Sequence, residues 1–441
     1  MPLEPWPRCP EAAAYFSQLL TEFCIKNPPV AALARRLEDE GGVDLHSLVD
    51  HWTLPPSEGL EEKLLALGLV KTTLPEGDEV FSHPGARLPR LRIKAKRTTP
   101  VLALGVENVR EFCEKQNLPL DSLHGDDDSG YQCGHVELPD GELMPIVRRG
   151  YVGFAPQTAP QDLAEIRESL RARPREGDEL AVISEARARF ETAEKSLGAG
   201  RATEEFFAAE REFYLVRNAA ARWQYGRQVK LGIGWANHDH HTYRSSRAAF
   251  QDLIRLFVSM GFVCRERFYA GAEAGWGAQV LDHPESRVVI FADVDVSPEE
   301  LDLDFSEALL PTKNSLGTIG LWCALHGSSI AAAGMHHIEC EFLCQKVKND
   351  AIASGFPVMA PFTELPYLWQ AFTQGEIWPV SPEKLRPLVS VGHISAEQAE
   401  KFEKIGALGS HLEILQRWEG FKGFNKTAVS NIIRDTDARR N

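Results

Sequence analysis

The sequence lacks the features that mark membrane, secreted and disulfide-rich proteins. No apolar run approaches the roughly 18 to 20 residues of a membrane-spanning helix. The N-terminal segment, MPLEPWPRCPEAAAYF, has acid and proline where a secretory signal would need a basic start and an unbroken apolar stretch. The 8 cysteines are scattered without a CxxC pair, so they indicate neither a zinc ribbon nor a disulfide framework. We therefore expect a cytoplasmic protein with reduced thiols and no membrane partner.

Positive charge is also scarce. The formal net charge is −15, which disfavours nonspecific binding of nucleic acid, because phosphate contacts need clustered Lys and Arg. The one basic cluster, RLPRLRIKAKR at residues 87–97, is either a local anion site or a solvated edge strand. We favour the edge strand, since edge strands commonly carry Lys and Arg that prevent pairing with other chains.

What is present is the composition of an ordinary globular protein, with 43% hydrophobic and 25% charged residues. At 441 residues the chain exceeds the usual size of one domain. Residues 1–85 are predicted to be helical, residues 86–158 to form a small α+β module, and residues 159–228 to form a helical hairpin linker. Residues 229–441 are predicted to carry the chemistry. The order of strand, helix and strands in residues 86–158 recurs later, which hints at a degenerate internal repeat.

The C-terminal region has two units of strand, helix and several strands, and each unit opens with a histidine-bearing strand, HDHHTYRSS and then GMHHIECEFL. Two such units can pair into one half-open β-barrel around a shared cavity. The predicted fold class is therefore α+β, with a helical N-terminal extension.

Side chains alternate along a strand, so His240 would share a face with Arg244, and His337 with Glu339 and Glu341. The strand HLEILQR would add Glu413. Two imidazoles and one carboxylate from three strands make a facial triad, which leaves open positions on one side of an Fe(II) ion. The spacing alone leaves other ligands open, namely His238, His241 and His336, and His240 and Arg244 would share a face on a helix too.

Several motifs resemble the 2-oxoadipate dioxygenase/decarboxylase (2-hydroxyglutarate synthase) family of the vicinal oxygen chelate superfamily. The segment NHDHHTYRSS, together with residues 261–301, resembles the opening unit of that family, with a DHxxxR-like pattern on His240 and Arg244. A His-His-apolar pattern falls on His336 and His337, and a YEFIER-like pattern on LEILQR, followed by GFKGF. The likeness covers about residues 230–435.

The resemblance implies a vicinal-oxygen-chelate-like fold with Fe(II) bound by His240, His337 and Glu413. It implies that the enzyme uses O2 to oxidise, decarboxylate and hydroxylate a small 2-oxo acid, whose carboxylate Arg244 would bind. The chain departs from the family pattern at Leu412, which replaces an aromatic residue, and the N-terminal half has no assigned counterpart.

Five further side chains were considered for the predicted site. Arg417 would orient Glu413 or bind a second carboxylate, unless it forms a structural ion pair. Glu339 or Glu341 would accept a hydrogen bond from a ligand imidazole. Gln370 and Thr373 lie in LPYLWQAFT, which resembles a pocket-lining segment of the family. The alternative interpretation is that this segment is a core helix.

Two other functions remain open at this stage. One is a non-redox metal-dependent isomerase, lyase or transferase of the same superfamily, which consumption of oxygen would exclude. The other is a protein that binds a small carboxylate without turnover. The sequence does not indicate the substrate, the oligomeric state or the role of residues 1–228.

Overall fold

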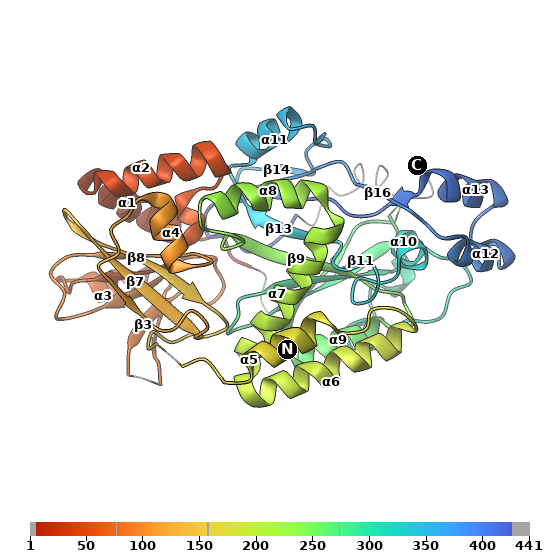
Figure 1. The fold of residues 1–441 in the computed structure, drawn as a ribbon, viewed down its shortest axis with the longest axis horizontal. Coiled ribbons are helices and arrows are strands. Elements are labelled where there is room, and N and C mark those ends of the chain that lie inside the picture. Colours follow the sequence, from red (N-terminus) through yellow and green to blue (C-terminus); the bar gives the residue numbers. More distant parts are fainter. Residues whose placement is uncertain (1–5, 76, 157, 273, 426–441) are drawn as a thin grey trace.

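The computed structural model describes residues 6–75, 77–156, 158–272 and 274–425. It contains two eight-stranded mixed sheets, one from each half of the chain (Figure 1). Residues 426–441 of the predicted C-terminal region lie outside the described residues. In the described part of the chain, no helix is long and apolar enough to cross a membrane.

The N-terminal sheet has the strand order β2-β3-β4-β1-β5-β8-β7-β6. Its strands are β1 (Val49–Leu54), β2 (Val70–Thr73), β3 (Glu79–Ser82), β4 (Arg90–Ile93), β5 (Val101–Gly105), β6 (Ser122–His124), β7 (Tyr131–Leu138) and β8 (Gly141–Arg148). The helices α3 (Leu60–Ala66) and α4 (Val109–Gln116) follow β1 and β5.

The C-terminal sheet has the equivalent order β10-β11-β12-β9-β13-β18-β15-β14. Its strands are β9 (His238–Arg244), β10 (Val263–Tyr269), β11 (Trp276–Asp282), β12 (Val289–Asp295), β13 (His337–Glu341), β14 (Thr363–Leu365), β15 (Leu368–Phe372) and β18 (Glu413–Arg417). The helices α9 (Phe250–Ser259) and α11 (Cys344–Ala353) follow β9 and β13.

Each sheet is therefore built from two units of one strand, one helix and three further strands. The first strands of the two units are antiparallel neighbours at the centre, β1 with β5 and β9 with β13. The predicted α+β class, with a half-open barrel of paired units and N-terminal helices, is confirmed. The repeat that the sequence hinted at extends over both halves of the chain.

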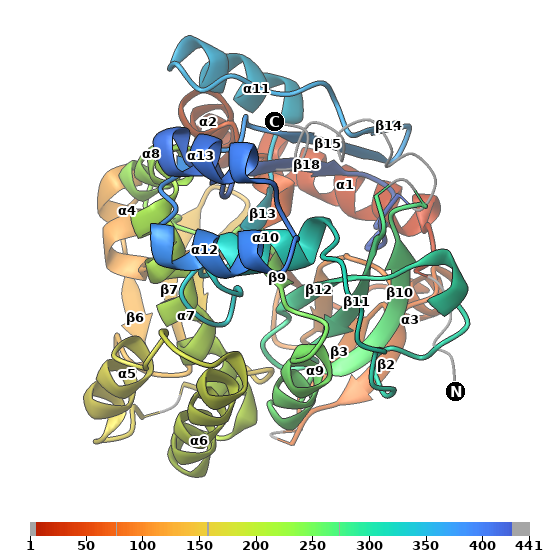
Figure 2. The ribbon, with the colours of Figure 1, turned by 90° about the vertical axis from the view of Figure 1, so that its right-hand side faces the viewer.

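The remaining helices lie outside the sheets. At the N-terminus these are α1 (Pro10–Lys26) and α2 (Pro28–Arg36), and between the halves α5 (Leu163–Arg171), α6 (Glu179–Leu197), α7 (Ala199–Arg217) and α8 (Ala219–Lys230). The last group is α10 (Thr318–His326), α12 (Pro382–Ser390) and α13 (Ala396–Ile405), which lie together (Figure 2). The short strands β16 (Ile377–Trp378) and β17 (Ala407–Leu408) pair with each other. Residues 159–228 are helical as predicted, but they form four helices rather than a hairpin.

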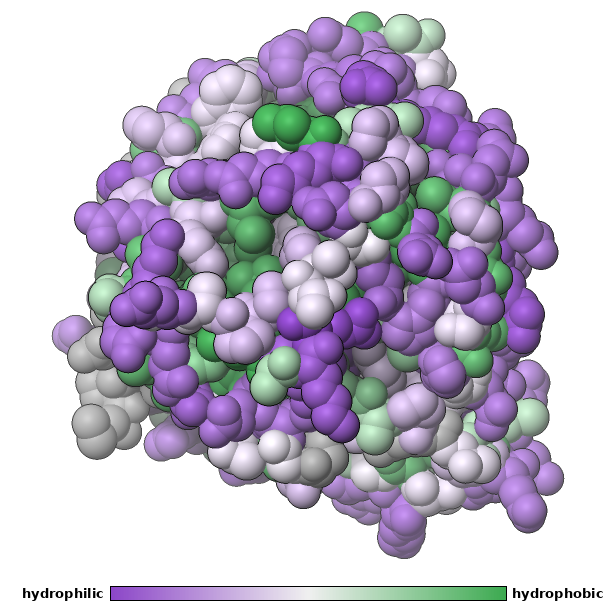
Figure 3. Space-filling model, turned by 90° about the vertical axis from the view of Figure 1, so that its left-hand side faces the viewer, coloured by the Kyte–Doolittle hydropathy of each residue, from purple (hydrophilic) through white to green (hydrophobic). Residues whose placement is uncertain are grey.

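One hydrophobic core runs through both halves, from Phe16 to Ile414. Helix α7 connects them, because Arg201 donates to the Ser129 carbonyl in the N-terminal half and the Tyr214 hydroxyl donates to the His411 carbonyl in the C-terminal half. The outer face of the N-terminal half is mostly hydrophilic, with apolar side chains visible mainly in recesses (Figure 3).

Local sequence explains where several elements begin and end. The Asn108 side chain accepts from the Glu111 amide at the start of α4, and Asn117 ends that helix in the left-handed region at φ 54°. Helix α9 turns Phe250, Leu253 and Phe257 inward at a spacing of three and four residues, as an amphipathic helix does.

Two sequence predictions are wrong in this half of the chain. Residues 1–85 are not helical throughout, because β1, β2 and β3 lie within them. The basic cluster is not an edge strand, since β4 lies between β3 and β1. Most of its charges are instead paired, for example Arg90 with Asp50 at 3.1 Å and Arg92 with Asp78 at 2.6 Å.

Candidate metal centre

The predicted triad residues come together on three adjacent strands. His240 lies on β9, His337 begins β13, and Glu413 begins β18. The register pairs Glu339 of β13 with His240 on one side and with Glu413 on the other. Because His337 precedes Glu339 by two residues, all four side chains share one face of the sheet.

The ligand atoms of His240, His337 and Glu413 lie within 4.8 Å of one another. The His337 Nε2 atom is 2.8 Å from Glu413 Oε2, and the His240 Nε2 atom is 4.0 Å from the same oxygen. The three residues are 3%, 9% and 2% exposed. This is a compact, buried set of two nitrogens and one carboxylate oxygen.

Glu339 is a second carboxylate at the same place. It is fully buried, and its Oε2 atom contacts His240 Nε2. Burial and the neighbouring Glu413 raise the pKa of Glu339 well above its usual range, and burial raises the pKa of Glu413 to about 7. Two buried carboxyl groups side by side repel each other when ionised, and a divalent cation between them would remove that cost.

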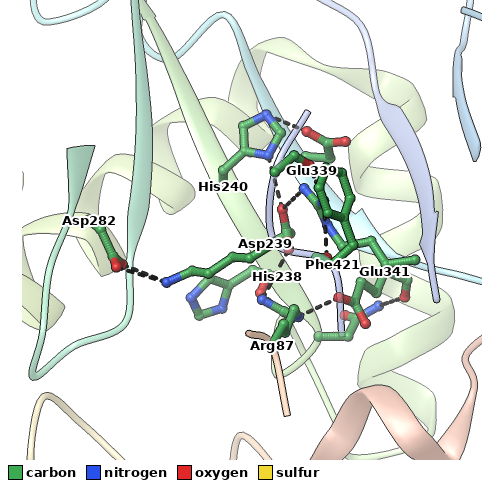
Figure 4. Close-up of polar contacts among 12 residues, drawn as sticks. Arg87, His238, Asp239, His240, Asp282, Glu339, Glu341 and Phe421 are labelled. Atoms are coloured by element: carbon green, nitrogen blue, oxygen red, sulfur yellow. Dashed lines mark hydrogen bonds and ion pairs between the residues drawn. The ribbon is translucent and has the colours of Figure 1, made fainter. Parts of the chain in front are cut away.

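Asp239 fixes the orientation of His240. Its Oδ2 atom lies 3.1 Å from His240 Nδ1, which leaves Nε2 directed toward the carboxylates (Figure 4). Although burial raises it, the pKa of Asp239 is held well below its usual range by Arg417 and Arg87. A metal-binding histidine characteristically donates its second ring N–H to such a carboxylate.

The alternative histidines lie elsewhere or in a neighbouring cluster. His238 Nδ1 is 2.9 Å from the Trp235 carbonyl, and the His238 ring contacts His241 rather than the triad. His241 lies 3.4 Å from Arg211 on the opposite face of β9. His336 instead packs with His337 and His411, in a second group whose ligand atoms lie within 4.8 Å of one another.

Arg244 ends β9 beside this second cluster. It is 6% exposed, and its guanidinium lies 5.2 Å from the centre of the Trp322 ring. Its ion pair with Asp293 is long, at 3.8 Å, and its Nε atom has no hydrogen-bond partner among the described residues. The guanidinium therefore has donor capacity left for a ligand.

Arg417 is placed differently from Arg244. Its Nη2 atom donates to Asp239 at 3.0 Å, and its Nη1 atom donates to the carbonyls of Phe421 and Gly423. Of the roles considered for it, the contacts favour an ion pair that acts on His240 through Asp239. Glu341 likewise points away from the triad and pairs with Arg87.

The Gln370 side chain contacts the carboxylates of the metal centre, whereas the Thr373 hydroxyl is hydrogen-bonded to the backbone. The Gln370 amide donates to Glu413 Oε1 at 3.0 Å and to Glu339 Oε1 at 3.2 Å. Thr373 Oγ1 accepts from the Leu412 amide at 3.0 Å and so holds the chain just before Glu413. Gln370 lies on strand β15, so the alternative of a core helix in this segment is wrong.

Two residues of the site were not predicted. Asp239 was missed because strand alternation directs it away from the His240 face, although its side chain still reaches His240 Nδ1. His411 precedes Glu413 by two residues but lies outside the strand, and its ring stacks on His337 at 4.9 Å. The DH pair in the first motif was the available signal for Asp239.

The N-terminal sheet does not repeat the centre. Matching the registers of the central strands places His51 at the position of His240, Val101 at that of His337, Ala103 at that of Glu339, and Met144 at that of Glu413. Val101, Ala103 and Met144 belong to an apolar cluster with Phe154. Of the four matched positions, only that of His240 has a histidine in the N-terminal sheet as well, namely His51.

Comparisons with known proteins add little about activity. No family model matches the sequence. A search of curated proteins likewise finds no match. The resemblance to the 2-oxoadipate dioxygenase/decarboxylase family therefore stays a prediction.

The solved structures that match have low similarity. A protein from Shewanella frigidimarina NCIMB 400 that was named as a hydrolase is 16% identical over 50% of this chain and 96% of its own, with a TM-score of 0.34. The methylmalonyl-CoA epimerase from Mycobacterium tuberculosis is 10% identical over 41% and 88%, with a TM-score of 0.24. A mutant of 4-hydroxymandelate synthase from Streptomyces coelicolor is 10% identical over 89% and 97%, with a TM-score of 0.28. At these values the likeness gives no evidence on activity.

Proposed function

We propose that this chain is an Fe(II)-dependent oxygenase that oxidatively decarboxylates and hydroxylates a small 2-oxo acid with O2. The observation that carries the proposal is the buried set of His240, His337 and Glu413, in which Asp239 turns the His240 ring toward the centre. Two histidines and one carboxylate with open positions are the characteristic ligands of non-haem Fe(II) oxygenases.

The donor geometry fits one ion. Metal–nitrogen and metal–oxygen bonds of about 2.1 Å bring two ligand atoms at right angles to within about 3 Å of each other. The 2.8 Å separation of His337 and Glu413 matches this spacing, and the 4.0 Å separation of His240 and Glu413 needs a small closure. Burial lowers the pKa of His337 well below its usual range, so its ring is neutral, as a metal ligand must be.

When bound, the iron would supply the redox chemistry with O2, and the protein would supply position and a dry environment. Asp239 holds the proton on His240 Nδ1 and so keeps Nε2 available as a ligand atom. Gln370 donates to both Glu413 and Glu339, which fixes these carboxylates beside each other. Phe291 and Phe424 cover the His240 ring, each at 5.0 Å, and exclude water from that side.

Arg244 is the proposed binder of substrate carboxylate, because a planar guanidinium can form two parallel hydrogen bonds with it. Its neighbourhood is rich in unpartnered polar atoms. Both ring nitrogens of His336 and Nε2 of His411 have no hydrogen-bond partner among the described residues. Buried polar atoms are rarely left unpaired, so these atoms favour a polar ligand on the Arg244 side of the triad.

The proposal is tested by the metal content of protein purified without oxygen. We expect one Fe per chain in the wild type and loss of that iron in His240→Ala, His337→Ala and Glu413→Ala, each of which should remain folded. His241→Ala is the matched control, because His241 lies on the opposite face of β9. If His241→Ala lost the iron while His240→Ala kept it, the assignment of the ligands would be wrong.

A further inference from the structure

A large cavity lies between the two halves of the molecule. It has a volume of about 1210 Å³ and is lined by residues of both sheets and of α7. From the N-terminal half it is lined by Asp50, Arg90 and Arg148, and from the C-terminal half by Asp282, Arg287 and Lys422. A pocket of this size is large enough for a small-molecule ligand.

The charges on these six residues do not balance. Asp50 is shared by Arg90 at 3.1 Å, Arg148 at 3.0 Å and Arg287 at 3.7 Å. Lys422 pairs with Asp282 at 2.8 Å (Figure 4 shows Asp282). The group thus holds four cations and two carboxylates, an excess of two positive charges, whereas the rest of the lining holds seven cations and eight carboxylates.

Arg287 is held more loosely than the other cations of the group. Its ion pair with Asp50 is long, at 3.7 Å, and 45% of its side chain is accessible to solvent. It adopts φ 61°, a conformation that bulky residues rarely take.

Arg90 and Arg148 also form hydrogen bonds with the backbone. Arg148 donates to the carbonyls of Tyr151 and Gly153, and Arg90 donates to that of Val152, so both hold the loop after β8. The Nε atom of Arg90 nevertheless has no hydrogen-bond partner among the described residues, and Arg90 is 8% exposed. Holding a loop explains the position of these side chains but leaves the excess charge uncompensated.

We propose that this cavity binds a small polyvalent oxyanion, which is either a polycarboxylate or a phosphate. Arg287 and Lys422 would contact the anion, and Arg90 and Arg148 would add positive charge beside them. Guanidinium groups suit both kinds of oxyanion, because each presents several acceptor oxygens. None of the triad residues lines the cavity, although Arg87 and Arg417, which pair with Asp239, do.

The test is isothermal titration of the full chain with citrate and, separately, with inorganic phosphate, each at constant ionic strength. We expect saturable binding of at least one of them, and the stronger binder identifies the source of the oxyanion. Arg287→Asn should weaken it tenfold or more, and asparagine tolerates the left-handed backbone, so the fold should be retained. Lys422→Gln should weaken binding in the same direction.

Two further variants make the test decisive. Asp282→Asn removes a negative charge from the cavity and should tighten binding, whereas a merely structural role would not produce a gain. Arg255→Gln removes a cation from the surface of α9, where Arg255 is 59% exposed, and should leave binding unchanged. The proposal is overturned if neither anion binds saturably, or if Arg287→Asn, Lys422→Gln and Asp282→Asn all bind as the wild type does.

Discussion

Single residues decide whether the triad can hold a metal, and Asp239 is the clearest case. Its carboxylate contacts His240 Nδ1 on one side and is held by Arg417 and Arg87 on the other (Figure 4). Asp239→Asn keeps the shape but weakens the interaction that fixes the ring. We expect metal affinity to fall about 10- to 100-fold. Competition with a chelator of known affinity measures this change, and unchanged affinity would show that Asp239 does not support the ligand.

Arg244 allows a second test at this scale. Arg244→Lys keeps the charge but loses the paired geometry, and loss of a charge-assisted hydrogen bond costs about 1.5 to 3 kcal/mol. That corresponds to roughly a 10- to 150-fold fall in kcat/KM, with iron content and Tm nearly unchanged. Kinetics with carboxylate-bearing substrates and neutral analogues check it. Loss of iron, or equal weakening of all substrates, would assign Arg244 to the scaffold.

At the same scale, the sequence predicted positions better than it predicted contacts. The strand motifs correctly placed His240, His337 and Glu413 near one another. Alternation along a strand cannot show that Asp239 reaches back to its neighbour, because that depends on the ring orientation of His240. The alternation also could not show that Arg417 pairs with Asp239, since the two residues are far apart in sequence.

At the scale of elements, short apolar segments were the difficult cases. VDHWTL in β1 has three apolar residues without a clear period, and the apolar run of LPYLWQAF around β15 suits a buried strand or part of a buried helix equally well. Tertiary pairing decides between them: β1 lies between β4 and β5, and β15 between β18 and β14. The helical character of residues 159–228 was predicted, but the break at Asn218 between α7 and α8 was not.

The β7–β8 hairpin gives a prediction for pH dependence. Hydrogen bonds with Cys133 and Glu142 raise the pKa of His135 from 6.5 to about 9. Because the folded pKa is the higher one, the stabilisation is fully present below pH 6.5 and is lost as the pH rises through about 9. His135 is 26% exposed, so we expect a loss on the order of 1 kcal/mol.

The free energy of unfolding of the wild type and of His135→Gln, measured at pH 6, 7.5 and about 9.5, checks this expectation. The difference between the two proteins should shrink as the pH rises. A difference that is constant across the range, or one that grows, would show that the hairpin pair does not titrate in this way.

At the scale of the whole molecule, two sheets of equivalent strand order carry different side chains at the matching positions. The N-terminal sheet keeps His51 but has Val101, Ala103 and Met144 where the C-terminal sheet has its other polar residues. We therefore expect one metal ion per chain and no loss of metal in His51→Ala. Elemental analysis of both proteins measures this, and two ions per wild-type chain, with one lost in His51→Ala, would contradict it.

The similarity of the halves was the feature that the sequence revealed least. The boundary predicted at residue 85 cuts through the first unit, which runs from β1 to β4. Its helix, α3, is short, and its strands β2 to β4 have four residues each, so the periodicity signal is weak. The C-terminal units were easier to predict because histidine-bearing motifs mark where they open.

Oxygen consumption by the Fe(II)-loaded protein, recorded against a panel of small 2-oxo acids without a separate 2-oxo acid co-substrate, tests the central claim most directly. The account predicts that one of them supports O2 uptake with release of an equal amount of CO2, and that His240→Ala abolishes both. Full turnover of a substrate without oxygen, with Mn, Zn or Ni serving as well as Fe, would contradict it and favour a non-redox isomerase or lyase.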